Sequence, residues 1–165
     1  RRMCWKCRKE TTVVALGVPY GEPYELDEDD IAEGIYPSYN PETYDSLALI
    51  PRLGATPREL RDYLETHYHY RLKCSQTTGV LQLNNCCDHC EALQGEFFDF
   101  QEPDGVFFPT SIKGIENLKF YRVRTKGALY GLIDGWSTLD EHLFRYAQGH
   151  HEELDLGIVE NIYLP

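Results

Sequence analysis

The residues with the clearest chemical potential in this chain are its cysteines, four of which form two pairs with the same spacing. One pair is Cys4 and Cys7 in the stretch CWKC, and the other is Cys87 and Cys90 in CDHC. Two intervening residues let a tight turn aim both sulfurs at one point, so two such turns supply four thiolates. Four sulfurs at about 2.3 Å satisfy tetrahedral Zn²⁺ without a further ligand. The spacing therefore predicts a zinc site made by these four cysteines.

The paired cysteines resemble a Cys4 zinc ribbon, although they indicate no specific family. The resemblance implies a structural site, because four protein thiolates leave no open coordination position. Ribbon turns usually carry glycine after the second cysteine, whereas this chain has Arg8 and Glu91. The gap from Cys7 to Cys87 is 79 residues, against about 15 to 20 in compact sites. Iron, bound as in rubredoxin, is the alternative occupant.

The long gap predicts that the metal ties the N-terminal segment to a distant hairpin. Closing such a loop costs about 4 kcal/mol of chain entropy by (3/2)RT ln n, so metal loss should loosen the whole acidic excursion at residues 17–46. Two other interpretations of the cysteines remain open, namely disulfides in an extracellular protein and a redox-active CWKC. Cys86 is expected on the strand face opposite Cys87, with ligation at CxxxC spacing as its alternative. Cys74 is expected to be a buried small residue in a strand.

Histidines are the remaining candidates for chemistry: His67, His69, His89, His142, His150 and His151. Because His67 and His69 alternate with tyrosines, packing and hydrogen bonding are favoured over a second metal site, with His67 half-buried. His150 and His151 follow a predicted helix end, where imidazoles interact with the last carbonyl groups. His89 should point outward and donate a hydrogen bond. No GxSxG, HExxH, Walker or GxGxxG motif is present, so the sequence supplies no warrant for a named enzymatic activity.

One acidic window accounts for most of the net charge of −11, because residues 10–51 contain ten acidic residues and no Lys or Arg. Phosphate backbones are bound by clustered cations, so this charge argues against a nucleic-acid binder and favours a protein partner with a basic surface. The alternative is an acidic segment that only packs over the sheet. Tyrosine offers large contact area at low entropic cost. The predicted contact residues are therefore Tyr20, Tyr24, Asp27, Glu28, Asp29, Asp30, Tyr36 and Tyr39.

Two helices are predicted from caps and periodicity. The first begins at Thr56, where Thr56 and Glu59 match a capping box around Pro57. Its apolar face should carry Leu60, Tyr63, Leu64 and His67. The second is predicted over residues 138–148, with Thr138 and Glu141 as another capping box and Gly149 after its end.

Strands are predicted on both sides of the first helix. A hairpin should span residues 69–85 with its turn at 77–79, and it leads directly into the second cysteine pair. The acidic, proline- and tyrosine-rich residues 17–46 should form an ordered, irregular excursion. The other predicted strands cover residues 11–16, the two halves of 91–109 around an EPDG turn, 116–124, 128–134 and the tail 156–165.

These elements predict a single α+β domain over residues 1–165, with a mainly antiparallel sheet, about two helices and a zinc-ribbon-like clasp. No apolar run approaches the roughly 20 residues of a membrane helix, and no signal peptide is evident, so a soluble, cytoplasmic protein is expected. The favoured function is a small zinc-binding protein that acts by protein–protein interaction, as an acidic inhibitor or immunity-type protein does. The alternatives are a zinc-ribbon nucleic-acid module that uses residues 119–126 and an enzyme with a histidine-containing cleft at His67, His69 or His142.

Overall fold

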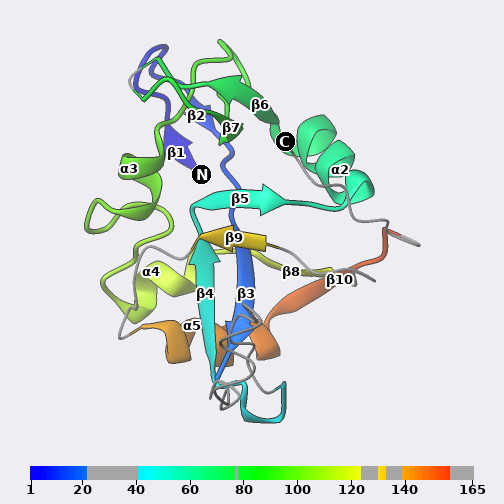
Figure 1. Ribbon diagram of the computed structural model, residues 1–165. Coiled ribbons are helices and arrows are strands. Elements are labelled where there is room, and N and C mark those ends of the chain that lie inside the picture. Colours follow the sequence, from blue (N-terminus) through cyan, green and yellow to red (C-terminus); the bar gives the residue numbers. More distant parts are fainter. Residues whose placement is uncertain (22–40, 77, 124–129, 133–138, 157–165) are drawn as a thin grey trace, which may run out of the picture.

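The computed structural model describes residues 1–21, 41–76, 78–123, 130–132 and 139–156. In this part of the chain, four α-helices and ten short strands give a mixed α+β architecture (Figure 1). The helices are α2 (Arg58–Tyr68), α3 (Glu96–Phe100), α4 (Ile112–Glu116) and α5 (Asp140–Gly149), with a 3-10 turn η1 at Pro41–Thr43. The strands are β1 (Arg2–Met3), β2 (Glu10–Thr11), β3 (Leu16–Tyr20), β4 (Ser46–Ile50), β5 (Arg52–Ala55), β6 (Tyr70–Cys74), β7 (Leu81–Asn85), β8 (Phe120–Val123), β9 (Tyr130–Leu132) and β10 (His151–Leu154).

The strands pair two by two within the described residues. Four pairs are antiparallel, namely β1 with β2, β3 with β4, β5 with β9, and β6 with β7. The fifth pair, β8 with β10, is parallel. The predicted antiparallel character is therefore confirmed for four of the five pairs, although the strands form separate ribbons rather than one broad sheet.

The helix α2 forms where the sequence predicts it, but its N-terminus differs from the predicted capping box. Pro57 is the N-cap residue, and no side-chain hydrogen bond caps the helix. The buried Thr56 hydroxyl and Glu59 Oε2 have no hydrogen-bond partner in the structure, so the predicted box between them is wrong. The helix ends at His69, whose φ of 51° is left-handed and turns the chain into β6.

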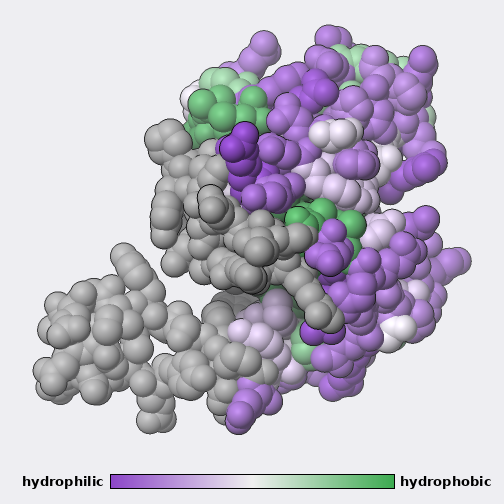
Figure 2. Space-filling view, turned by 90° about the vertical axis from the view of Figure 1, so that its right-hand side faces the viewer, coloured by the Kyte–Doolittle hydropathy of each residue, from purple (hydrophilic) through white to green (hydrophobic). Residues whose placement is uncertain are grey.

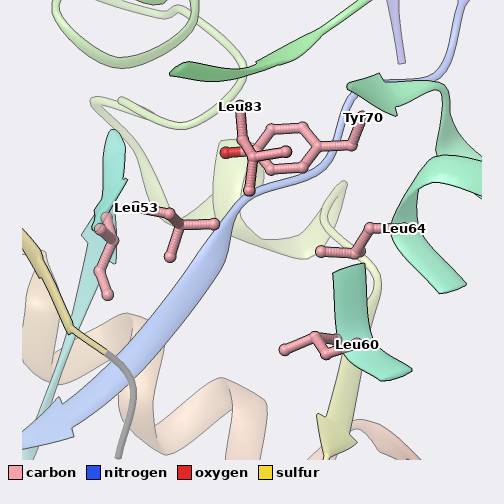
Figure 3. Close-up of a cluster of buried hydrophobic side chains, with 6 residues drawn as sticks. Leu53, Leu60, Leu64, Tyr70 and Leu83 are labelled. Carbon is pink, nitrogen blue, oxygen red and sulfur yellow. The ribbon is translucent and has the colours of Figure 1, made fainter. Parts of the chain in front are cut away.

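The hydrophobic core lies between α2 and the strands beside it. Leu60 and Leu64 point from α2 toward Leu53, Tyr70 and Leu83, as Figure 3 shows. Each of these side chains is at most 7% exposed, and burial of one Leu contributes about 1.5–3 kcal/mol. The helical spacing of Leu60 and Leu64 therefore fixes α2 against the β6–β7 hairpin, which leads into the second cysteine pair.

The segment after the second cysteine pair contradicts the predicted strands in residues 91–109. Residues 96–100 form the helix α3, and turns follow it. The aromatic content favoured a strand, but a helical spacing lets the chain bury Asp99 (2% exposed) while Phe97 and Phe98 stay at the surface. Gly95, at φ 61°, permits the sharp entry into this helix.

The N-terminal part also differs from the prediction. Strand β2 ends at Thr11, so the predicted strand 11–16 is replaced by an extended link to β3. Residues 17–20 belong to β3 and pair with β4, so the predicted excursion 17–46 begins and ends in regular structure. Its central residues 22–40 lie outside the described part of the chain, as do Thr138 and the predicted tail strand.

Among the residues coloured by hydropathy in Figure 2, most are hydrophilic, and the hydrophobic residues gather in small areas. Helix α5 packs against β4, close to the predicted position of the second helix. Among the helices that the structure describes, none has the length and apolar character needed to cross a membrane.

Candidate metal centre

The first cysteine pair lies in the loop that joins β1 to β2, the blue loop at the upper left of Figure 1. The Cys4 N–H donates to the Lys9 carbonyl at 2.9 Å, and the Arg8 N–H donates to the Cys4 carbonyl at 3.0 Å. Arg8 has a φ of 60°. We call this CxxC turn, residues 4–9, the first knuckle.

The second cysteine pair follows β7 and repeats this geometry. The Cys87 N–H donates to the Ala92 carbonyl at 2.9 Å, and the Glu91 N–H donates to the Cys87 carbonyl at 3.0 Å. Glu91 has a φ of 56°. Residues 87–92 are therefore a second knuckle of the same form. Both knuckles adopt the left-handed backbone that glycine usually provides, although Arg8 and Glu91 stand there instead.

The two knuckles bring the four predicted cysteines together. Their Sγ atoms all lie within 4.8 Å of one another, with 3.7 Å from Cys4 to Cys90 and 3.6 Å from Cys7 to Cys87. A tetrahedron with Zn–S bonds of about 2.3 Å has edges of about 3.8 Å, so these spacings suit four ligands around one ion. All six cysteines of the chain are free thiols in this structure.

Electrostatics at the cluster also favour a cation. Burial opposes ionisation of Cys4, but the Cys7 N–H and the Gln94 amide stabilise its thiolate and lower its pKa to about 6. The Lys9 N–H would lower the pKa of Cys7, yet burial and the neighbouring sulfurs raise it to about 11. Burial likewise opposes ionisation of Cys87, but the N–H groups of His89 and Cys90 lower its pKa. Thiolates are thus favoured at Cys4 and Cys87 and opposed at Cys7, and a metal ion between the sulfurs would remove that conflict.

Hydrogen bonds outside the sulfur cluster tie the first knuckle's strands to the second knuckle. Asp88 accepts from the Thr12 N–H at 2.9 Å, while its own N–H donates to the Thr11 hydroxyl at 3.0 Å. His89 is exposed and donates from Nε2 to the Glu10 carbonyl at 3.0 Å. The predicted outward-pointing role of His89 is confirmed, and these bonds explain why residues far apart in sequence stay in register.

Three contacts that the sequence prediction missed strengthen this junction. The Asn85 amide pairs with both backbone groups of Val14, at 2.9 Å from the Val14 N–H and 3.0 Å to its carbonyl. Arg2 forms an ion pair with the buried Asp99 on α3. The Gln94 amide donates to Cys4 Sγ at 3.5 Å. In the sequence, the only sign of this role for Asn85 is its position directly before Cys86 and Cys87.

The two remaining cysteines are placed differently from each other. Cys86 is fully buried outside the four-sulfur cluster, and its thiol donates to the Asn84 carbonyl at 3.6 Å. Burial raises the pKa of Cys86, which suits a neutral packed thiol. Cys74 is exposed, so its predicted burial is wrong. It lies at the end of β6 opposite Leu81, itself 62% exposed, because the hairpin extends beyond the core there.

The other histidines are dispersed rather than gathered. His67 is exposed, contrary to the predicted half-burial, and its Nδ1 lies 3.0 Å from the Tyr63 carbonyl. His150 and His151 lie 3.1 and 2.8 Å from the carbonyls of Tyr146 and Ala147, which confirms their predicted interaction with the end of α5. Within the described residues, the four-cysteine cluster is the only group of three or more ligating side chains that could hold a metal.

Of the predicted partner-contact residues, Tyr20 is the one that lies in the described part of the chain. Tyr20 is 8% exposed, and its hydroxyl donates to Asp140 Oδ2 on α5 at 2.7 Å. Burial and this carboxylate raise the pKa of Tyr20 to about 12, so its ring packs inside the protein. The other predicted contact residues lie outside the described part of the chain: Tyr24, Asp27, Glu28, Asp29, Asp30, Tyr36 and Tyr39.

The cluster as a whole could coordinate one metal ion through four protein sulfurs, with Cys4 and Cys87 buried and Cys7 and Cys90 half-buried. Comparison of the chain with protein-family models, curated proteins and solved structures gives no match.

Proposed function

We propose that this chain binds one structural Zn²⁺ ion through Cys4, Cys7, Cys87 and Cys90. The observation that carries the proposal is the convergence of two knuckles of the same form, with their four sulfurs at the spacing of a tetrahedral site. Thiolate donors suit Zn²⁺, and iron in the same geometry is the alternative occupant. Since the protein supplies all four ligands, the metal has no open position for a substrate, and its role is to hold the fold together.

The metal would act as a clasp between segments that are distant in sequence. The first knuckle precedes β3, whereas the second knuckle follows the β6–β7 hairpin. Its energetic role follows from this distance, because metal binding offsets the entropy of closing a loop of about 80 residues, at about 4 kcal/mol. Loss of metal should therefore lower the free energy of unfolding of the whole chain rather than loosen one loop.

Metal content and thiol titration of the native protein test the proposal. One zinc per chain with four protected cysteines is expected, and removal by a chelator should expose those four thiols. Cys90→Ser should abolish stoichiometric zinc, while Cys74→Ser, a change at an exposed cysteine outside the cluster, should retain it. Disulfides among the four cysteines, or full zinc content in Cys90→Ser, would refute the site.

The interaction role predicted from the acidic window stays a proposal carried by the sequence. We infer from its charge that the window binds a basic protein surface, as an inhibitor or immunity-type protein would. A pull-down that compares the full chain with a variant carrying Asn at Asp27, Asp29 and Asp30 would test it. Equal capture of a basic partner by both proteins would contradict this role, whatever the zinc content.

A further inference from the structure

The outer surface of the first knuckle carries an exposed aromatic ring among cations. Trp5 is 56% exposed, and Lys6, Arg8 and Lys9 are all exposed beside it. Residues 1–9 contain five basic and no acidic residues, so this end of the molecule has a charge opposite to that of the acidic window. The backbone hydrogen bonds that Cys4 makes with Arg8 and Lys9 hold these side chains on a short, closed turn.

Trp5 is fixed rather than freely rotating. Its Nε1–H donates to the Leu93 carbonyl at 2.6 Å, beside the second knuckle. The polar edge of the indole is thereby satisfied within the protein, while more than half of the side chain remains open to solvent. An exposed indole held in this way offers a platform on which a planar base can stack.

The cations around this ring are available for an outside ligand. Within the part of the chain that the structure describes, no ion pair engages Lys6, Arg8 or Lys9. The carboxylates of Glu10, Glu91 and Asp88 already form contacts with other groups. Glu10 pairs with Arg1 at 3.0 Å, and Glu91 pairs with Arg71 at 3.0 Å. Asp88 accepts from the Thr12 N–H, so among the described residues no carboxylate pairs with these three cations.

We propose that the first knuckle binds single-stranded nucleic acid, with a base stacked on Trp5 and backbone phosphates paired with Lys6, Arg8 and Lys9. This inference rests on the proposed metal, which would fix the knuckle's conformation. The combination of an indole face with three unpaired cations fits a flexible strand better than a duplex, whose bases are already stacked. An acidic peptide could use the cations but gains less from the flat ring.

The net charge of −11 is a total over the whole chain, whereas binding at the first knuckle depends chiefly on the charges close to it. Exposed charges farther apart than about 8 Å are largely screened at physiological ionic strength. The basic residues of the first knuckle are contiguous, whereas the acidic excess is carried by residues 10–51. The other basic stretch, residues 119–126, is a weaker candidate, since Arg122 lies 3.7 Å from Glu153 on the paired strand β10.

Binding of zinc-loaded full-length chain to a labelled oligo(dT) of about twelve nucleotides, followed by fluorescence anisotropy, tests the inference. With three phosphate contacts, the logarithm of the binding constant should fall with the logarithm of salt concentration at a slope of about −2. Trp5→Ala should weaken binding about 5- to 150-fold. Glutamine at Lys6, Arg8 and Lys9 should weaken binding and flatten the salt slope. The matched control is a variant with glutamine at three exposed cations elsewhere on the protein, namely Arg58, Lys113 and Arg145.

Zinc content is measured on every preparation, so the two proposals fail separately. Absence of zinc overturns the proposed metal site. Zinc-loaded protein that shows no binding, or equal binding by the first-knuckle variants and the control, overturns the nucleic-acid site alone. Tighter binding of a poly-glutamate peptide than of oligo(dT) assigns the surface to an acidic protein partner and likewise overturns it.

Discussion

Asn85 is expected to be the most sensitive uncharged residue of the junction between the knuckles. Among the residues that the structure describes, no strand pairs with the segment after β2 at Val14, and the Asn85 side chain supplies the hydrogen bonds that such a strand would make. Asn85 Oδ1 accepts from the Val14 N–H, and Asn85 Nδ2 donates to the Val14 carbonyl. Asn85 is only 6% exposed, so little water reaches these bonds. Asn85→Ala would remove both bonds at once, together with the longer donation from Asn85 Nδ2 to Asp99 Oδ2 at 3.5 Å, and leave both backbone groups of Val14 without a partner from this side chain.

The magnitude follows from those two backbone groups. A buried donor or acceptor that loses its partner costs about 1–3 kcal/mol. Because Val14 is half-buried rather than fully buried, we expect the loss of both bonds to lower the free energy of unfolding by about 2–4 kcal/mol. Since small domains are stable by about 5–15 kcal/mol, this loss should be plain in an equilibrium unfolding curve.

Urea unfolding of the zinc-loaded protein measures the effect, with Asn84→Ala as the matched control. Asn84 is half-buried, and its amide donates to the carbonyls of Lys73 and Gln82 at 3.1 and 2.8 Å within the hairpin. Its removal should cost about 1 kcal/mol. If Asn85→Ala lowers the free energy of unfolding no more than Asn84→Ala does, the Asn85 amide does not hold the N-terminal segment in place.

Two further predictions concern ionisation and thiol reactivity. Burial raises the pKa of Asp99 to about 6 despite the opposing charge of Arg2, so the folded chain binds this proton more tightly than the unfolded chain, where the pKa is near 3.8. The Asp99 contribution to the free energy of unfolding should therefore fall by up to about 3 kcal/mol as pH rises from about 4 to about 6, then stay level. The difference between wild type and Asp99→Asn isolates this slope, and a difference that does not change with pH would contradict it. A maleimide should label the exposed Cys74 of native protein quickly and the buried Cys86 only on unfolding. Peptide mapping that finds native Cys86 modified first would show that its burial is wrong.

The parts of this fold that the sequence predicted correctly are those governed by local spacing. Leu60 and Leu64 place α2 by helical periodicity, and the 70–85 hairpin follows from two short strands around a glycine turn. The four-cysteine cluster was predictable in the same way, since each CxxC pair fixes its own sulfurs and the shared chemistry joins the pairs.

The errors arise where a tertiary contact outweighs a local preference. Residues 96–100 are aromatic enough for a strand, yet they form α3, which holds Asp99 against Arg2, a residue far away in sequence. The capping box at Thr56 fails because Pro57 itself becomes the N-cap. Cys74 matches a buried strand residue by type, but its strand continues past the edge of the core, and no local pattern reveals where the core ends.

Arg8 and Glu91 connect the metal site with the surface around it. Each occupies the left-handed position of its knuckle, where glycine would avoid about 1–2 kcal/mol of strain. At Glu91 a side chain is useful, because its carboxylate pairs with Arg71 at 3.0 Å and with Lys73 at 3.9 Å, which anchors the second knuckle to β6. Arg8 makes no such ion pair with the residues that the structure describes. Since a strained non-glycine residue persists only where the surrounding structure holds it, the backbone hydrogen bonds of the first knuckle account for the conformation of Arg8, and its exposed guanidinium stays available to the ligand proposed for the face of Trp5.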